Sequence, residues 1–209
     1  MNAQTERFTI EGPAGTLACA LDRPDGEPRG WLVACHPHPL HGGTMDNKVV
    51  QTVARAGLAL GMAVLRFNFR GVGGSAGAWD EGRGEVDDAL AVIAAGRERV
   101  GAAGPFALAG FSFGGYVAAA AADRLAPELK PQRLALVAPS TRNHQAPAVA
   151  DVDATLLVHG ETDDVVPLAA SLDWARPQGL PVVVVPGVGH FFHGALPQLK
   201  AIVLRAWRP

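Results

Sequence analysis

Short runs of apolar residues alternate along the chain with longer segments in which apolar residues recur at helical spacing. Trp31 to Cys35 is a continuous apolar run, which is typical of a strand buried on both faces. Thr44 to Leu60 instead carries an apolar residue every three or four positions, which predicts a helix that ends at Gly61. The same two kinds of segment follow one another over most of the sequence, so the pattern predicts alternating strands and helices.

The alternation predicts a mostly parallel sheet with right-handed crossovers and helices on both faces, preceded by an antiparallel hairpin. Strands are expected at Arg7 to Ile10, Leu17 to Leu21, Trp31 to Cys35, Ala63 to Phe69, Phe106 to Phe111, Leu134 to Ala138, Thr155 to His159 and Pro181 to Val185. Helices are expected at Thr44 to Leu60, Glu85 to Arg99, Gly114 to Leu125, Leu168 to Ala175 and Gly194 to Trp207. We therefore expect a single α/β domain over residues 1–209, with its functional groups at the carboxyl ends of the strands.

Composition narrows the class of protein. The 209 residues are 48% hydrophobic and 18% charged, which fits a globular chain rather than a disordered one. A net charge of −2 offers no attraction to nucleic acid or to an anionic membrane, so neither partner is expected. No apolar run reaches the roughly 18 residues of a membrane span, and Met1 to Ile10 lacks the apolar core of a signal peptide. The expectation is a cytoplasmic monomer or homodimer.

The strongest chemical signal is the segment Gly110-Phe111-Ser112-Phe113-Gly114, which fits G-x-S-x-G. It lies between a predicted strand and a predicted helix, the context in which this motif forms a tight turn that exposes a serine nucleophile. Serine is a weak nucleophile at neutral pH and needs a neighbouring base. The motif therefore makes Ser112 the candidate nucleophile and directs the search to a histidine and an acid.

Both partners follow in the chain order Ser, Asp, His that this kind of fold requires. Asp163 comes after the strand that ends at His159, and His190 comes after the last predicted strand. Asp164 competes with Asp163 for the role of the acid, and one of the two is expected to cap the helix near Pro167. His193 competes with His190, but it falls at the start of the final helix and is expected to be a cap or surface residue.

These motifs together resemble the α/β-hydrolase superfamily, and most closely a group of small lidless bacterial hydrolases related to dienelactone hydrolases and to serine aminopeptidase-like proteins. The matching segments are Cys35 to Met45, Arg66 to Ser75, Gly110 to Gly114, His159 to Pro167 and Gly189 to His193. In the superfamily the acid is the fifth residue of H-G-x-x-D-x-x-V-P, which is Asp163 here. The resemblance implies a serine hydrolase of the carboxylesterase kind that needs no cofactor.

An acyl-transfer enzyme also needs N–H donors for the oxyanion. One donor is expected to be the backbone N–H of Phe113, directly after the nucleophile. Pro37 and Pro39 have no N–H, which leaves His36, His38 and Leu40 for the second donor. The resemblance favours His38, although Pro37 stands where the superfamily has a glycine.

The three histidines at positions 36, 38 and 41 raise the question of a metal site. A structural zinc site needs four ligands, and no second pair of ligands stands at matching spacing, so no metal is expected. Arg70 is expected to be a structural hydrogen-bond donor rather than a substrate ligand.

The expected substrate is a small or medium ester. Lids in this fold enter after the sixth strand, and here residues 140–153 are too few to build one. An open site is therefore expected, with an apolar wall drawn from Leu40, Trp79, Phe113, Phe191 and Phe192. A peptidase or amidase with the same triad, and a non-catalytic binding protein on the same fold, are the alternatives.

Overall fold

Eight strands form one sheet in the computed structural model, which describes residues 5–101 and 104–208. The strand order is β1-β2-β4-β3-β5-β6-β7-β8, in which β1 and β2 form the antiparallel hairpin and β3 to β8 run parallel. The strands are β1 (Glu6–Gly12), β2 (Gly15–Asp22), β3 (Gly30–Cys35), β4 (Met62–Phe67), β5 (Phe106–Phe111), β6 (Arg133–Val137), β7 (Thr155–Gly160) and β8 (Val182–Val185). The predicted α/β architecture is confirmed.

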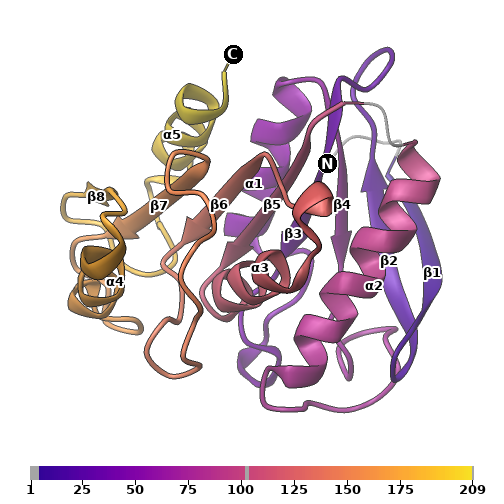
Figure 1. Cartoon of the computed structure of the whole chain (residues 1–209), viewed down its shortest axis with the longest axis horizontal. Coiled ribbons are helices and arrows are strands. Elements are labelled where there is room, and N and C mark those ends of the chain that lie inside the picture. The colour runs from indigo at the N-terminus through magenta and orange to yellow at the C-terminus, as the bar shows by residue number, and fades with distance from the viewer. Residues whose placement is uncertain (1–4, 102–103, 209) are drawn as a thin grey trace.

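Helices cover both faces of the sheet (Figure 1). On one face, α2 (Arg83–Val100) and α3 (Phe113–Arg124) share a buried apolar cluster with the sheet. On the other face, α1 (Lys48–Ala59) and α5 (Leu196–Trp207) do the same. The helix α4 (Leu168–Ala175) follows β7 in the chain, and its Ala175 belongs to the buried cluster of α2 and α3. No described helix has the length and apolar composition that crossing a membrane requires.

Most boundaries differ from the expected ones by a few residues, and polar side chains explain two of the differences. The first helix begins at Lys48 rather than Thr44, because the Asn47 side chain accepts the Val49 N–H at 2.9 Å and caps the helix there. The strand β4 ends at Phe67, and the chain then turns so that the Asn68 side chain accepts the Met45 N–H at 2.9 Å. The last helix begins at Leu196 rather than at position 194.

The segment between β6 and β7 contains no helix or strand over residues 138–154, all of which the structure describes. The expectation that no cap domain covers the carboxyl ends of the strands is therefore confirmed. Short 3-10 turns occur elsewhere, at Pro39–His41, Pro127–Leu129 and Arg176–Gln178.

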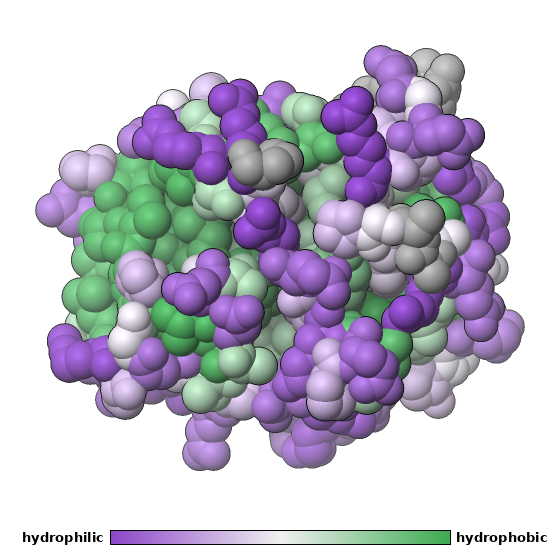
Figure 2. All heavy atoms as spheres, turned by 45° about the horizontal axis from the view of Figure 1, so that its top comes forward, coloured by the Kyte–Doolittle hydropathy of each residue, from purple (hydrophilic) through white to green (hydrophobic). Residues whose placement is uncertain are grey.

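The strand β8 forms one edge of the sheet and is apolar where it meets solvent. Val183 and Val184 are each 37% exposed, in contrast to the fully buried β3 and β5. Figure 2 shows a broad apolar area on the side of the molecule that carries β8. Pro181 and Pro186 flank the strand, and proline restricts further strand pairing because it has no N–H to donate.

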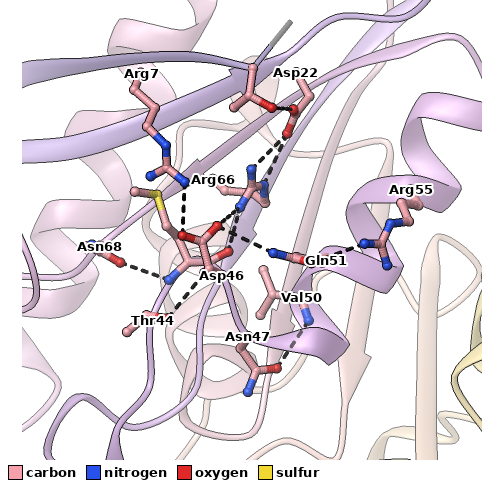
Figure 3. A network of polar contacts seen from close by, with 12 residues as sticks. Arg7, Asp22, Thr44, Asp46, Asn47, Val50, Gln51, Arg55, Arg66 and Asn68 are labelled. Carbon is pink, nitrogen blue, oxygen red and sulfur yellow. Dashed lines mark hydrogen bonds and ion pairs between the residues drawn. The ribbon is translucent and has the colours of Figure 1, made fainter. Parts of the chain in front are cut away.

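A buried arginine ties the segment after β3 to the sheet (Figure 3). Arg66 is 0% exposed and pairs with Asp22 through Nη2 at 3.0 Å and Nε at 3.2 Å. Its Nη1 donates to the Met45 carbonyl at 2.8 Å and to Asp46 at 2.9 Å. These contacts anchor the chain between β3 and α1, the segment that also carries the expected oxyanion donor.

We expect Arg66→Met to lower the free energy of unfolding by about 3–5 kcal/mol, because Asp22 would remain buried without its charged partner. Adding Asp22→Leu should recover part of this loss by removing the uncompensated charge. Arg7→Ala is the control, since the pair of Arg7 with Asp46 is solvent-exposed and such pairs contribute about 0–1 kcal/mol. Urea denaturation of the wild-type protein and the three variants measures these differences in the free energy of unfolding. An unchanged stability of Arg66→Met would contradict the assignment.

Candidate active site

The candidate nucleophile Ser112 lies in a strained turn between β5 and α3. Its backbone has φ 56° and ψ −119°, a combination that L-residues rarely adopt and that the surrounding structure must hold in place. A Cβ on Gly110 would lie 1.9 Å from the Gly114 carbonyl oxygen, and a Cβ on Gly114 would lie 2.4 Å from the Cys35 carbonyl oxygen. Both glycines are therefore required for α3 to start this close to β3 and β5.

The structure brings the three residues singled out from the sequence into one hydrogen-bonded chain. His190 Nε2 lies 3.0 Å from Ser112 Oγ, and His190 Nδ1 lies 2.7 Å from Asp163 Oδ2. All three are almost entirely buried, with 7%, 3% and 8% of Ser112, His190 and Asp163 exposed. With the carboxylate ionised, Nδ1 carries the proton and Nε2 is free to accept the Ser112 O–H, which is the arrangement that a general base requires.

The Asp163 carboxylate is surrounded by hydrogen-bond donors. Its Oδ1 accepts the backbone N–H groups of Val165 at 2.9 Å and Val166 at 2.8 Å. Its Oδ2 is close to His190 Nδ1 and also to His159 Nε2, at 3.2 Å. Burial raises the pKa of Asp163, but the hydrogen bonds from His159, His190 and Val166 outweigh it and hold the pKa well below its ordinary value.

Asp163, the favoured acid, is the aspartate that faces His190, whereas the expectation that the other aspartate caps the helix near Pro167 is wrong. Asp163 itself supports the turn before α4 through Oδ1 while it faces His190 through Oδ2. Asp164 is exposed, and no hydrogen bond or ion pair of its side chain is found within the described part of the chain. One carboxylate performs both tasks because its two oxygens point in different directions. His193 is exposed and precedes α5, so it is a surface residue and does not cap that helix.

The expected oxyanion donors lie in suitable local structures. Phe113 is the first residue of α3, and the N–H groups at the start of a helix have no acceptor within it. His38 precedes the 3-10 turn Pro39–His41, and its Nδ1 accepts the Leu40 N–H at 3.2 Å. That bond occupies Leu40, one of the two alternatives to His38. The His38 and Phe113 rings are 5.2 Å apart, so the two segments lie side by side.

His36 is a structural residue rather than an available ligand. It is 0% exposed, its Nδ1 donates to the Pro37 carbonyl at 2.6 Å, and its Nε2 accepts the Phe69 N–H at 3.0 Å. Burial lowers the pKa of His36 to about 4, so both nitrogens serve hydrogen bonding in the neutral ring. Over residues 5–101 and 104–208, no group of three His, Cys, Asp or Glu side chains is placed to hold a metal ion.

A cluster of aromatic rings borders the Phe113 side of the site. The His38 ring lies 4.4 Å from the His41 ring and 4.5 Å from Trp79. Burial and the neighbouring His41 and His144 lower the pKa of His38. Two further members of this cluster, Tyr116 and His144, were not expected from the sequence, and their rings stack with centroids 4.9 Å apart. His144 belongs to the segment after β6, and nothing in its local pattern indicated this contact.

The expected apolar wall is only partly available to a ligand. Leu40 is 65% exposed and Phe191 is 45% exposed, and the Phe191 ring lies 5.0 Å from the His190 ring. Phe113 and Phe192, by contrast, are 1% and 0% exposed and belong to the core. Their inclusion in the wall was wrong, because the chain turns at Phe192, with φ 53°, and directs that side chain inward against α1 and α5.

Arg70 is held by the protein, in agreement with a structural role. Its guanidinium forms a two-pronged contact with Asp88, with Nη2 to Oδ1 at 2.7 Å and Nε to Oδ2 at 3.0 Å. Asp88 also accepts the Arg70 backbone N–H at 2.9 Å. The loop after β4, which carries Trp79, is thereby fixed to α2.

Cavity size alone would place the site elsewhere. A cavity of about 890 Å³ lies at the amino ends of the strands, lined in part by Arg29, Met62 and Trp207. Its lining includes none of the three hydrogen-bonded residues, which lie at the carboxyl ends. We place the chemistry at Ser112 because a strained serine, an oriented histidine and a buried carboxylate meet there.

Comparison with known proteins is consistent with this geometry. A family model described as serine aminopeptidase, S33 matches residues 26–154, a range that includes Ser112 but ends before Asp163. The structure of a lidless α/β serine hydrolase from Xanthomonas campestris is 36% identical, covers 99% of this chain and 94% of that one, and superposes with a TM-score of 0.88.

An α/β serine hydrolase homologue from Coxiella burnetii is 40% identical, covers 100% of this chain and 99% of that one, and has a TM-score of 0.87. An uncharacterised protein of Rickettsia prowazekii is 38% identical over 109 residues. That stretch is 52% of this chain, and it spans only 46% of the relative's own length.

The unequal environments of the two aspartates predict unequal effects of Asp163→Asn and Asp164→Asn. Because the pKa of Asp163 is lower in the folded chain, its charge stabilises the fold above the unfolded pKa of about 3.9, and this contribution is lost as the pH falls. Asp163→Asn should therefore be less stable than the wild-type chain at pH 7, by a margin that shrinks below about pH 4. Asp164→Asn should match the wild-type chain throughout.

Urea denaturation at a series of pH values measures both variants. Equal losses for the two substitutions, or a margin for Asp163→Asn that grows in acid, would contradict the hydrogen-bonding assignment.

Proposed function

This chain belongs to the α/β serine hydrolase family whose model is described as serine aminopeptidase, S33, and we propose that it hydrolyses small to medium carboxylic esters. The observation that carries the proposal is the hydrogen-bonded chain from Ser112 Oγ through His190 to Asp163. Ser112, His190 and Asp163 act as nucleophile, general base and orienting acid in two-step acyl transfer.

In the first step, His190 Nε2 takes the proton from Ser112 Oγ as that oxygen attacks the ester carbonyl. Asp163 keeps the Nδ1 proton of His190 in place and stabilises the imidazolium that forms. His190 then gives the proton to the leaving alcohol, and the acyl group remains on Ser112. Water attacks this acyl-enzyme by the same route, with His190 as base and then as acid, which releases the carboxylic acid and restores Ser112.

The negative charge on the carbonyl oxygen is held by the backbone N–H groups of Phe113 and His38. Phe113 offers the first N–H of α3, where the helix dipole also favours negative charge. A donor aimed at the developing oxyanion lowers the activation free energy by about 3–4 kcal/mol. No cofactor takes part in this scheme.

The surroundings of Ser112 favour an ester with modest apolar groups. Leu40, two residues after His38, and Phe191, whose ring lies 5.0 Å from the His190 ring, are both exposed, so each offers apolar surface on a segment that carries a site residue. Trp79 and the His38 ring add aromatic surface on the Phe113 side. The matching family description also names aminopeptidases, so a peptidase or amidase reaction by the same three residues is the second candidate.

Labelling with a fluorophosphonate probe tests the proposed nucleophile. The wild-type chain should form a stable adduct on Ser112 and hydrolyse p-nitrophenyl esters, whereas Ser112→Ala should fold normally and do neither. Mass spectrometry locates the adduct. Aminoacyl anilides, assayed in parallel, separate the two candidate reactions. Labelling of Ser112→Ala at the wild-type rate would falsify the assignment, and faster anilide than ester turnover would favour the peptidase.

The absence of a cap domain predicts how rate depends on acyl-chain length. Each buried methylene contributes about 0.8 kcal/mol, roughly fourfold in kcat/KM, but only while protein surface continues beside it. The value of kcat/KM should therefore rise over short p-nitrophenyl esters and then level off. Leu40→Ser should flatten the rise without changing the rate on the acetate. A preference for palmitate, or a jump in rate when the substrate forms an emulsion, would contradict an open site.

A further inference from the structure

A second histidine, His159, contacts the same oxygen of the Asp163 carboxylate that faces His190. It is the next-to-last residue of β7 and 0% exposed. Its Nε2 lies 2.8 Å from the Val166 carbonyl oxygen and 3.2 Å from Asp163 Oδ2. A carbonyl only accepts hydrogen bonds, so the proton is on Nε2, and this single N–H is shared between the carbonyl and the carboxylate.

The remaining nitrogen of His159 has no partner. Among the buried side-chain atoms of the described residues, Nδ1 is one of the few without a hydrogen bond. A buried polar atom in this state costs stability, and a leucine of similar size would avoid the cost. Packing alone therefore does not explain an imidazole at this position, whereas the N–H that it directs at Asp163 does.

We propose that His159 is a positioning residue, whose Nε2–H fixes the orientation of the Asp163 carboxylate so that Oδ2 faces His190. This inference rests on the proposed function of the Ser112, His190 and Asp163 chain. The Val165 and Val166 N–H groups hold Oδ1. His159 supplies a second contact on Oδ2 beside that of His190, so the carboxylate cannot rotate about its Cβ–Cγ bond without losing a donor.

The same N–H closes the loop that contains Asp163. The chain leaves β7 after Gly160, and the Val166 carbonyl brings it back into contact with the His159 side chain. One imidazole thereby sets both the path of the loop and the direction of the carboxylate. It acts on the reaction only through Asp163 and does not touch the substrate.

Two variants separate the N–H donor from the bulk of the ring. His159→Leu keeps the volume and removes the donor, whereas the amide of His159→Gln places an N–H near the position of Nε2. Active sites are counted by fluorophosphonate titration, so that kcat refers to folded enzyme. We expect His159→Leu to lower kcat on p-nitrophenyl butyrate by roughly 10- to 100-fold with little change in KM, as for a misplaced catalytic group. His159→Gln should restore most of the rate.

Two controls distinguish positioning from general damage. Leu157→Ala, on the same strand and also 0% exposed, should destabilise the fold without changing kcat per titrated site. In an Asp163→Asn background, His159→Leu should cause little further loss, because the two residues act through one interaction. With His159 unchanged, the proton resonance of its Nε2–H should lie further upfield in Asp163→Asn than in the wild-type chain, since an amide oxygen accepts a hydrogen bond more weakly than a carboxylate.

Three outcomes would overturn the positioning role. The first is an unchanged kcat for His159→Leu, and the second is that His159→Leu lowers kcat by the same factor in the Asp163→Asn background as in the wild-type chain. The third is a proton resonance that does not move. The resonance test remains decisive if His159→Leu does not fold. A wild-type chain that neither labels nor hydrolyses esters would instead remove the proposed function itself, and that result is visible before any variant is made.

Discussion

The close approach of α3 to the end of β3 is the constraint on which the site depends. Gly114 brings the first turn of the helix within contact of the Cys35 and His36 carbonyls, where a Cβ would have no room. This approach forces Ser112 into a positive φ and leaves its side chain directed toward His190. It also places the Phe113 ring 5.2 Å from the ring of His38, so that the two segments adjoin. The strain at Ser112 is offset by the packing of α3 against the sheet, so the stability of the fold maintains the geometry of the nucleophile.

Buried polar groups, rather than apolar packing, fix the loops at the carboxyl ends of the strands. Asp163 receives donors from its own loop, from His190 and from His159. Arg66 holds the segment after β3, and Arg70 with Asp88 holds the loop after β4. Hydrogen bonds depend on direction as well as distance, which suits them to orienting loops that no cap domain covers. Loss of any one partner would leave a buried charge or donor unsatisfied.

The open site has walls of different character on its two sides. On the Phe113 side, His38, His41 and Trp79 form part of an aromatic cluster to which the loop after β6 contributes His144. On the other side, Phe191 lies against the His190 ring. Because no cap closes over these walls, the proposed function implies that recognition rests on surface within reach of Ser112 and that long extensions of a substrate stay in solvent.

The sequence by itself determined the order of strands and helices, because apolar spacing reports which side of each element is buried, and it supplied the residues that meet at Ser112. Its motifs named Asp163 as the acid, but they could not show that the same carboxylate also accepts the loop N–H groups, since the direction of its two oxygens depends on the fold. It placed Phe192 in the wall, whereas a positive φ at that residue directs the ring into the core. His159 lies only four residues before Asp163, but its local pattern does not give the direction of its imidazole. Tyr116 and His144 meet from segments distant in sequence. Spacing along the chain carries no record of such contacts, so the tertiary structure alone decided them.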